Sequence, residues 1–311
     1  MTLHQASGRW RLGLALAVAT ALFWASLPIA LKQALTALDP YTITWFRFLF
    51  AALCTFGWLA WRGQLGQFRG LEGGHRGLLA IAAIGLIGNY LGYLLGLDHT
   101  TPANAQLLIQ MAPLLFAVGG VLVFKERVAA GQLLGYGAIV AGLLAFSTEQ
   151  RAAAAQPERY LLGIALMVGA AVTWAGYALA QKQLLQRLGS QAILLVIYVA
   201  AAVLLLPLAT PSTLADLRGV DALALLYCAF NTIFAYGCFA AAIEHWEASR
   251  VGAVLATTPM LTLIFSGTLS LLLPGALTPE QLGPWTVGGA VLVVVGSVLA
   301  SLLKPKPASR A

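Results

Sequence analysis

Hydrophobic residues run through this chain in long segments that short polar links separate. The pattern is clearest at 85–127, where two apolar segments flank the link at 98–102. Each segment is long enough to cross the roughly 30 Å hydrocarbon layer of a membrane as a helix of about 20 residues. Ten such segments are expected, at 12–31, 41–61, 77–97, 103–124, 131–147, 160–180, 192–209, 222–243, 251–273 and 284–303. The pattern predicts an all-α integral membrane protein with ten transmembrane helices.

The hairpin at 85–127 carries polar groups on a face inside the membrane. Gly88, Gly92 and Gly96 recur at every fourth residue, which clears side chains from one helix face and lets a neighbouring backbone approach. Asn89 and Tyr93 lie beside this stripe. Because an amide in hydrocarbon costs several kcal/mol without a hydrogen-bond partner, Asn89 must face protein or a wet cavity.

Composition excludes a soluble domain. The chain is 60% hydrophobic and 9% charged, against the roughly 25% charged residues of a soluble protein, and its mean hydropathy is +0.84. The net charge of +7 comes from basic residues at the ends of apolar segments, which form no nucleic-acid-binding motif. All three cysteines lie in apolar stretches, so neither a disulfide framework nor a metal site is expected. No cofactor is expected, and the lipid bilayer is the expected partner of a monomer.

The placement of Lys and Arg predicts the orientation in the membrane. If the N-terminus is cytoplasmic, thirteen of the 18 basic residues fall on the cytoplasmic side. Only Lys32, Arg151, Arg159 and Arg218 fall on the opposite side, and Arg47 lies inside the second segment. The sequence therefore predicts a multi-pass protein of a bacterial inner membrane with both termini in the cytoplasm.

The second half of the chain repeats the first. Several residues recur at an offset of 150, among them Trp24, Lys32 and Gln33 as Trp174, Lys182 and Gln183. Three others recur at an offset of 146, namely Tyr90, His99 and Pro113 as Tyr236, His245 and Pro259. The expected division is a first repeat at 1–148, a linker at 149–159, a second repeat at 160–303 and a cytoplasmic tail at 304–311. Each repeat holds five segments, an odd number, so the repeats must be inverted, as in carriers that work by alternating access.

Three stretches resemble a known family. They are the Trp24 segment that ends at Lys32, the entry 40–47 into the second segment, and the hairpin from Gly96 through Pro113 to 125–127. With these stretches the chain resembles the bacterial EamA-type, ten-helix members of the drug/metabolite transporter superfamily over nearly its full length. It departs from them at Lys125, where the family has Gly, and at Leu272, which matches Glu126 of the first half.

The resemblance implies an inner-membrane secondary carrier that exports small metabolites, amino acids above all. Multidrug or organic-cation export and metabolite import by the same fold remain alternatives. A receptor or an assembly subunit of a membrane complex is the alternative outside transport, and it would bind a ligand without flux. An enzyme is not expected, because no nucleophile, base and acid converge in the sequence and no GxxxxGK[ST] loop for ATP is present.

Arg47 is the sharpest candidate for contact with a solute. It is the only basic residue well inside a segment, where charged residues are rare and usually functional. A guanidinium can hold a substrate carboxylate through two hydrogen bonds. The alternative is that Arg47 extends to the outer surface or pairs with an outer carboxylate such as Asp39 or Asp98.

Aromatic and amide side chains inside the segments predict the rest of a central cavity. The expected substrate-binding set, with Arg47, is Trp24, Asn89, Tyr90, Tyr93, Gln110, Trp174, Tyr177, Asn231 and Tyr236. Each member has an alternative structural role, as packing for the aromatic rings and as a hydrogen bond between helices for the polar groups.

Acidic residues are informative by their position. All eleven lie at or near segment ends, whereas a proton relay inside a membrane normally uses a buried carboxylate or histidine. We therefore expect an uncoupled facilitator or an exchanger, with coupling through the peripheral acids and His99 as the alternative. His99 and His245 lie in links on opposite sides and are expected to be solvated, with a gating or proton role as the lesser alternative. Glu126, between two basic residues, is expected to form an ion pair.

Overall fold

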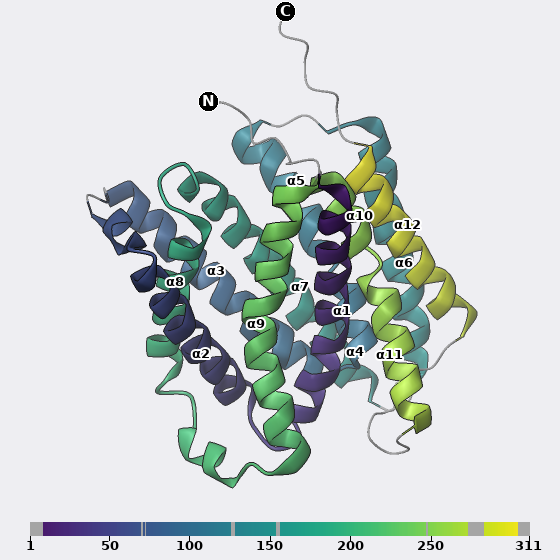
Figure 1. Cartoon of the computed structure of the whole chain (residues 1–311). Helices are drawn as coiled ribbons and strands as arrows, with labels where there is room; N and C mark the ends of the chain where they lie inside the picture. The colour runs from purple at the N-terminus through teal and green to yellow at the C-terminus, as the bar shows by residue number, and fades with distance from the viewer. Residues whose placement is uncertain are drawn as a thin grey trace, which may run out of the picture.

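The computed structural model describes residues 9–69, 71, 73–125, 128–153, 156–246, 248–272 and 283–303. Within these residues every regular element is a helix (Figure 1). The α-helices are α1 (Trp10–Ala34), α2 (Pro40–Trp61), α3 (Gly73–Asp98), α4 (Pro102–Leu108), α5 (Met111–Phe124), α6 (Ala130–Ala153), α7 (Pro157–Leu184), α8 (Ser190–Leu205), α9 (Gly219–His245), α10 (Ala248–Leu255), α11 (Thr258–Leu272) and α12 (Pro284–Leu302). Two short 3-10 helices, η1 (Gln64–Phe68) and η2 (Pro211–Asp216), follow α2 and α8.

The helices confirm the ten apolar segments. Nine spans in the described residues are long and apolar enough to cross a membrane, and α8 adds a shorter apolar helix of 16 residues. At a rise of about 1.5 Å per residue, α8 extends about 24 Å, slightly less than the hydrocarbon layer. The fold is therefore an all-helical bundle of ten membrane-crossing elements, as the sequence predicts.

Two segments expected as single helices are each broken into two. The segment at 103–124 divides into α4 and α5, and the segment at 251–273 divides into α10 and α11. Pro113 and Pro259 follow the breaks, and a proline has no N–H for the carbonyl four residues before it. The carbonyl of Ile109 accepts from Ala112 N at 2.9 Å instead. The carbonyl of Leu255 accepts from the Thr258 hydroxyl at 2.5 Å. The breaks occupy matching places in the two halves.

The two halves pack on one another through matching contacts. Helix α7 lies against α3 as α1 lies against α9. A Cβ added at Gly163 would lie 2.5 Å from Thr100 Cγ2, and one added at Gly13 would lie 2.4 Å from Trp246 Cβ. Gly13 and Gly163 are 150 residues apart, and Thr100 and Trp246 are 146 apart. The spatial contacts thus obey the same offsets as the sequence identities, as expected for two inverted five-helix repeats.

The expected linker at 149–159 is mostly helical. Helix α6 continues to Ala153 and α7 begins at Pro157, so residues at both ends of the linker belong to membrane helices. An alanine run favours helix, which is why α6 extends beyond the apolar segment. The tail at 304–311 and Glu126 lie outside the described residues.

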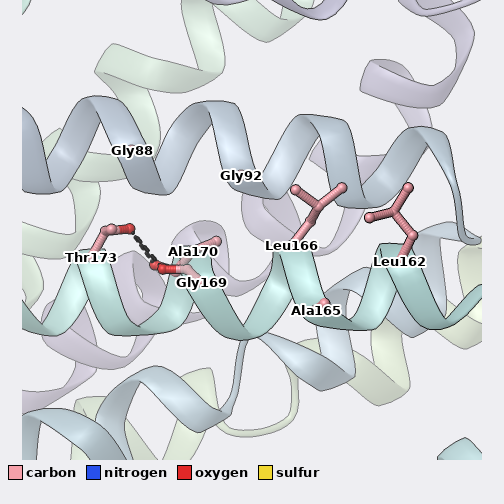
Figure 2. Close-up of a pocket in the computed structure, with 8 residues that line it drawn as sticks. All are labelled: Gly88, Gly92, Leu162, Ala165, Leu166, Gly169, Ala170 and Thr173. Atoms are coloured by element: carbon pink, nitrogen blue, oxygen red, sulfur yellow. Dashed lines mark hydrogen bonds between the residues drawn. The ribbon is translucent and has the colours of Figure 1, made fainter.

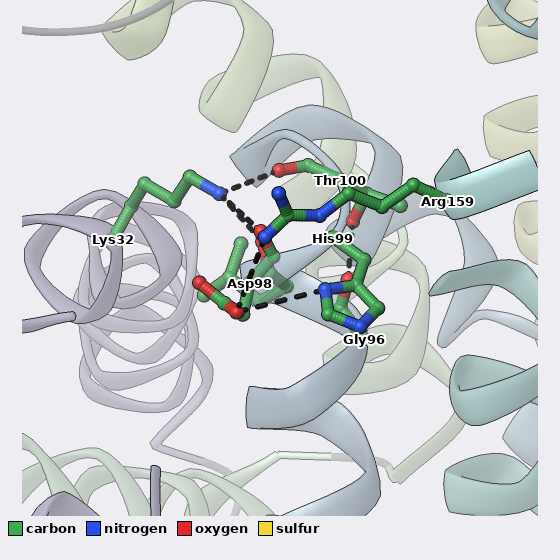
Figure 3. A network of polar contacts seen from close by, with 7 residues as sticks. Lys32, Gly96, Asp98, His99, Thr100 and Arg159 are labelled. Atoms are coloured by element: carbon green, nitrogen blue, oxygen red, sulfur yellow. Dashed lines mark hydrogen bonds and ion pairs between the residues drawn. The ribbon is translucent and has the colours of Figure 1, made fainter. Parts of the chain in front are cut away.

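At one end of the bundle, α1 is tied to the C-terminus of α3 (Figure 3). Lys32 Nζ donates to the carbonyls of Leu97, Asp98 and Thr100 at 2.9, 3.0 and 2.9 Å. A cation at this end satisfies carbonyls that the helix leaves free and complements its dipole. The Asp98 carboxylate contacts Arg159 of α7 at 3.7 Å and His99 Nδ1 at 3.5 Å. The contact with Arg159 joins α3 of the first half to α7 of the second.

Helices α6 and α12 meet along a seam of glycines. A Cβ at Gly289 would lie 2.6 Å from the carbonyl oxygen of Gly142, and a Cβ at Gly296 would lie 2.5 Å from that of Gly135. No other residue type fits at these positions unless the two backbones separate. The seam holds the last helix of each half together.

We predict that Gly289→Ala lowers the thermal stability of the protein. Its methyl group would overlap the α6 backbone, and overpacking of this kind costs about 1–3 kcal/mol. Gly288→Ala is the matched control, because a Cβ at Gly288 has no atom within 4 Å. The midpoint of thermal unfolding in detergent measures the effect, and equal midpoints for the two variants would contradict it.

Candidate functional site

Arg47 lies in the centre of the site, about two turns into α2. Its side chain is 4% exposed. Arg47 Nε donates to Thr232 Oγ1 of α9 at 3.1 Å, and the guanidinium carbon lies 4.8 Å from the centre of the Tyr90 ring of α3. Among the described residues, no carboxylate comes within ion-pair distance of Arg47 and no hydrogen bond reaches its two Nη atoms. The buried guanidinium therefore has donors to spare.

The structural alternatives for Arg47 do not hold in this structure. The low exposure of Arg47 shows that it does not extend to the outer surface. Asp39 is occupied at the start of α2, where it accepts hydrogen bonds from Tyr41 N and Thr42 N, both at 2.9 Å. Asp98 pairs with His99 and Arg159. Neither outer carboxylate meets Arg47.

Aromatic rings from both halves surround this charge. Tyr90 packs on Phe48 with ring centres 4.6 Å apart, and Phe48 packs on Tyr198 of α8 at 5.7 Å. The Tyr90 hydroxyl interacts with that of Tyr236 of α9. Tyr236 in turn meets the Trp24 ring of α1 edge to face at 5.7 Å. The structure thus brings Trp24, Arg47, Tyr90 and Tyr236 of the expected set into one cluster, which we call the central cluster.

Trp174 and Tyr177 form the adjoining wall on α7. Their ring centres are 6.4 Å apart, and Trp174 also meets Phe116 of α5 edge to face at 6.2 Å. Tyr177 is buried in the same apolar core as Phe48 and Tyr198, and Trp174 packs against that core. These two expected residues therefore lie beside the central cluster, and neither forms a hydrogen bond with Arg47.

The two asparagines of the expected set connect helices. Asn89 Nδ2 donates to the carbonyl of Ala170 in α7 at 2.9 Å. Asn231 Nδ2 donates to the carbonyl of Phe23 in α1 at 2.7 Å. These bonds satisfy the buried amides, as hydrocarbon surroundings require. One polar atom is left over, since Asn231 Oδ1 is buried and has no hydrogen-bond partner.

Tyr93 lies in α3, and Gln110 lies at the break between α4 and α5. The Tyr93 hydroxyl donates to Gln106 Oε1 at 3.2 Å. Gln110 is the first residue before α5 and its side chain makes no capping bond there. Arg47 lies close enough to Tyr93 for a Coulombic interaction, as it does to Tyr90. Tyr93 is therefore close to the central cluster.

Three residues of the central cluster are absent from the expected set, namely Phe48, Tyr198 and Thr232. A phenylalanine in an apolar segment carries no signal, and a threonine hydroxyl can bond to its own helix wherever it lies. Tyr198 lies in the middle of an apolar segment, where a hydroxyl needs a partner, and this signal could have identified it.

A groove of about 360 Å³ runs between α3 and α7 (Figure 2). Its lining is Gly88, Gly92, Leu162, Ala165, Leu166, Gly169, Ala170 and Thr173. The one hydroxyl in this lining donates back to its own helix, at 3.0 Å from the carbonyls of Gly169 and Ala170. Since the groove offers no free polar group, it cannot orient a polar solute. The central cluster is the better candidate site.

Comparison with known proteins gives the family. The model of the EamA-like transporter family matches the chain twice, at residues 11–148 and 161–302. The "Uncharacterized inner membrane transporter YhbE" of Escherichia coli K12 is 34% identical, over 94% of this chain and 91% of that protein. The "Probable amino-acid metabolite efflux pump" of Salmonella typhimurium LT2 is 29% identical, over 63% and 66%. A solved structure, "Crystal structure of protein", has a TM-score of 0.60 at 18% identity, over 96% of this chain and 98% of its own, and so shares the fold.

The start of α2, which places Arg47, depends on Asp39. Its carboxylate also accepts from the Thr42 hydroxyl at 2.5 Å and from the Thr210 hydroxyl at 3.0 Å. Burial raises the pKa of Asp39, but the hydrogen bonds from Thr42, Thr210 and Tyr41 together outweigh it, so the pKa lies below the ordinary carboxyl value. The ionised form is the one that stabilises the fold.

We predict that Asp39→Ala lowers stability at neutral pH by about 1 kcal/mol, the usual effect of losing an N-cap. Because the folded-state pKa is depressed, the contribution is complete above the unfolded value of about 3.9 and is lost as the pH falls through the folded value. Thermal unfolding of wild type and variant in detergent from pH 7 downward measures the gap. A gap that did not change with pH would contradict the role of the ionised carboxylate.

Proposed function

This chain belongs to the EamA-like transporter family, and we propose that it exports a small organic metabolite that carries a carboxylate, an amino acid above all. It is a multi-pass membrane transporter with inner-membrane relatives. The proposal adds the chemistry of the solute and the direction of transport. One observation carries it, the guanidinium of the buried Arg47, whose two Nη atoms have no hydrogen-bond partner among the described residues.

A buried cation without a counter-charge is costly. Removing a charge from water costs several kcal/mol even after the protein relaxes, and a partner with good hydrogen bonds is needed to recover it. Thr232 and the Tyr90 ring supply one hydrogen bond and one cation-π contact. A solute carboxylate would supply the missing charge and accept two parallel hydrogen bonds.

The aromatic rings fit the remainder of such a solute. Trp24, Tyr90 and Tyr236 offer apolar faces, with polar atoms at the edges of their rings. An amino acid presents a carboxylate to Arg47, an ammonium to ring faces and hydroxyl oxygens, and a side chain to apolar surface. The Salmonella relative named as an amino-acid metabolite efflux pump supports the same class of solute.

Alternating access follows from the way the halves share the cluster. Arg47 and Tyr90 come from the first half, whereas Thr232 and Tyr236 come from the second. A relative rotation of inverted halves around a shared site opens it first to one side and then to the other. The distribution of Lys and Arg favours cytoplasmic termini, so that export would start at the end of the bundle where α1 begins and α12 ends (Figure 1).

The alternatives fit the cluster less well. An organic cation would enter a site whose buried charge is already positive, and two like charges in a medium of low dielectric repel strongly. Import uses the same site, because concentration gradients decide the direction of an uncoupled carrier. A receptor or an assembly subunit would bind the solute with no flux. The efflux assay below separates the cation exporter and the receptor or assembly subunit from the proposed carrier.

We predict that Arg47→Gln lowers amino-acid efflux from proteoliposomes by about tenfold to a hundredfold. Hydrogen bonds to a charged group are worth about 1.5–3 kcal/mol. The vesicles are loaded with a labelled mixture of the protein amino acids, and parallel vesicles hold labelled tetraphenylphosphonium. Arg62→Gln is the matched control, because Arg62 lies at the exposed end of the same helix, over the Trp58 ring. Undiminished efflux in Arg47→Gln would contradict the carboxylate site, and movement of the cation alone would indicate drug export.

The same charge bears on energy coupling. Among the described residues, the buried polar set contains no Asp or Glu, so no carboxylate is placed to carry protons through the centre. In the loaded site the solute carboxylate would pair with Arg47, whereas the empty site would have to reorient with Arg47 unpaired. The proposed carrier therefore exchanges solutes faster than it releases them into an empty compartment.

We predict that amino acids outside the vesicles stimulate the efflux of labelled amino acids several-fold. A pH gradient alone should give no accumulation against a concentration gradient. Both are measured with the same proteoliposomes, and empty liposomes are the control. Accumulation driven by the pH gradient would overturn the uncoupled mechanism.

A further inference from the structure

The contact between Arg47 and Thr232 is directional. A threonine hydroxyl has one donor and two acceptor positions. Its donor is used on the carbonyl of Cys228, one turn back in α9, at 2.9 Å. The oxygen therefore accepts the hydrogen bond from Arg47, whose Nε lies 3.1 Å away, and it also interacts with the Tyr90 hydroxyl. Thr232 is 2% exposed, so no water competes for these bonds from bulk solvent.

The fold makes the same helix junction without these polar groups. Helices α2 and α8 begin 150 residues apart, at Pro40 and Ser190, and α3 and α9 begin 146 apart. At these offsets Arg47 corresponds to Ile197 and Thr232 to Leu86. Ile197 and Leu86 are both buried in one apolar core. The α3–α8 contact thus holds with two aliphatic side chains where the α2–α9 contact has a charge and a hydroxyl, so packing does not require the polar pair.

We infer that Thr232 is a positioning residue for substrate binding, which holds the Arg47 guanidinium by Nε so that the edge formed by its two Nη atoms faces the solute carboxylate. This inference rests on the proposed function. A guanidinium can offer a carboxylate either the edge with both Nη atoms or the edge with Nε and one Nη. Thr232 occupies Nε, and the Tyr90 ring at 4.8 Å restrains the plane of the group. Only the first edge is then free.

The consequence is an effect on affinity. Without the Thr232 hydroxyl, the guanidinium keeps its charge but can rotate about its last side-chain bonds. The free energy needed to order the guanidinium then reduces the affinity for the substrate. A merely structural threonine would instead change the amount of folded protein or the maximal rate.

Proteoliposomes that exchange the labelled mixture of protein amino acids test this inference. Thr232→Val removes the hydroxyl and keeps the shape, and Thr232→Ser restores the hydroxyl. Thr44→Val is the matched control, because Thr44 is a fully buried threonine of α2 whose hydroxyl bonds back to Pro40 O at 2.7 Å. We expect Thr232→Val to raise the half-saturating concentration about tenfold, in line with one lost hydrogen bond to a charged group, with little change in the maximal rate. Thr232→Ser and Thr44→Val should behave as wild type.

A second background makes the test specific to the guanidinium. In Arg47→Lys no Nε–H of a guanidinium exists, so Thr232→Val should change the half-saturating concentration no further. If Thr232→Val does not elute as a single folded species in size-exclusion chromatography, Thr232→Ala replaces it. An unchanged half-saturating concentration in Thr232→Val, or a tenfold rise in Thr232→Ser as well, overturns the inference. Loss of efflux in Arg47→Gln together with a normal Thr232→Val overturns the inference about Thr232 and leaves the proposed function intact. Normal efflux in Arg47→Gln overturns the proposed function itself.

Discussion

A hydrocarbon layer offers polar groups no hydrogen-bond partner, and this constraint explains most of the structure. Backbone groups are satisfied within helices, and where Pro259 interrupts one, the Thr258 hydroxyl takes the freed carbonyl. The carbonyls at the end of α3 are satisfied by Lys32. Buried amides reach the carbonyls of neighbouring helices, as Asn89 does with Ala170. The rule has exceptions among the described residues, since Asn231 Oδ1 and Ser266 Oγ are buried without a hydrogen-bond partner.

The constraint is met differently in the two halves. Gly85 and Asn231 occupy matching positions, and so do Thr173 and Phe23. A Cβ at Gly85 would lie 2.8 Å from the carbonyl oxygen of Thr173, which leaves the two backbones in contact. On the other side, Asn231 spans the corresponding gap and bonds to the carbonyl of Phe23. One junction is closed by the absence of a side chain and the other by an amide, so the duplicated halves share a topology but differ in the groups that join their helices.

The sequence could predict what depends on long patterns. Ten apolar segments can be recognised because each must be long enough to span the hydrocarbon layer. The repeat can be recognised because Trp24 and Trp174, or Pro113 and Pro259, differ from the aliphatic residues around them. The breaks at these prolines were harder to predict, since a proline inside a membrane helix can also be accommodated by a kink. The ends of the linker at 149–159 are helical, because helix formers such as the alanines after Arg151 extend α6 past the apolar pattern.

Within the candidate site, a rare residue type was more informative than a common one. Arg47 is distinguished by its charge alone, and Tyr90 and Tyr236 by their repeated position. Asn89 and Asn231 carry an equally strong polar signal, but a helix-to-helix bond satisfies that signal without any solute. Thr232 carries none, because a hydroxyl that bonds to its own helix looks the same in sequence whether or not a guanidinium lies beyond it. Its role depends on a contact across 185 residues of chain, which only the packing of α9 on α2 creates.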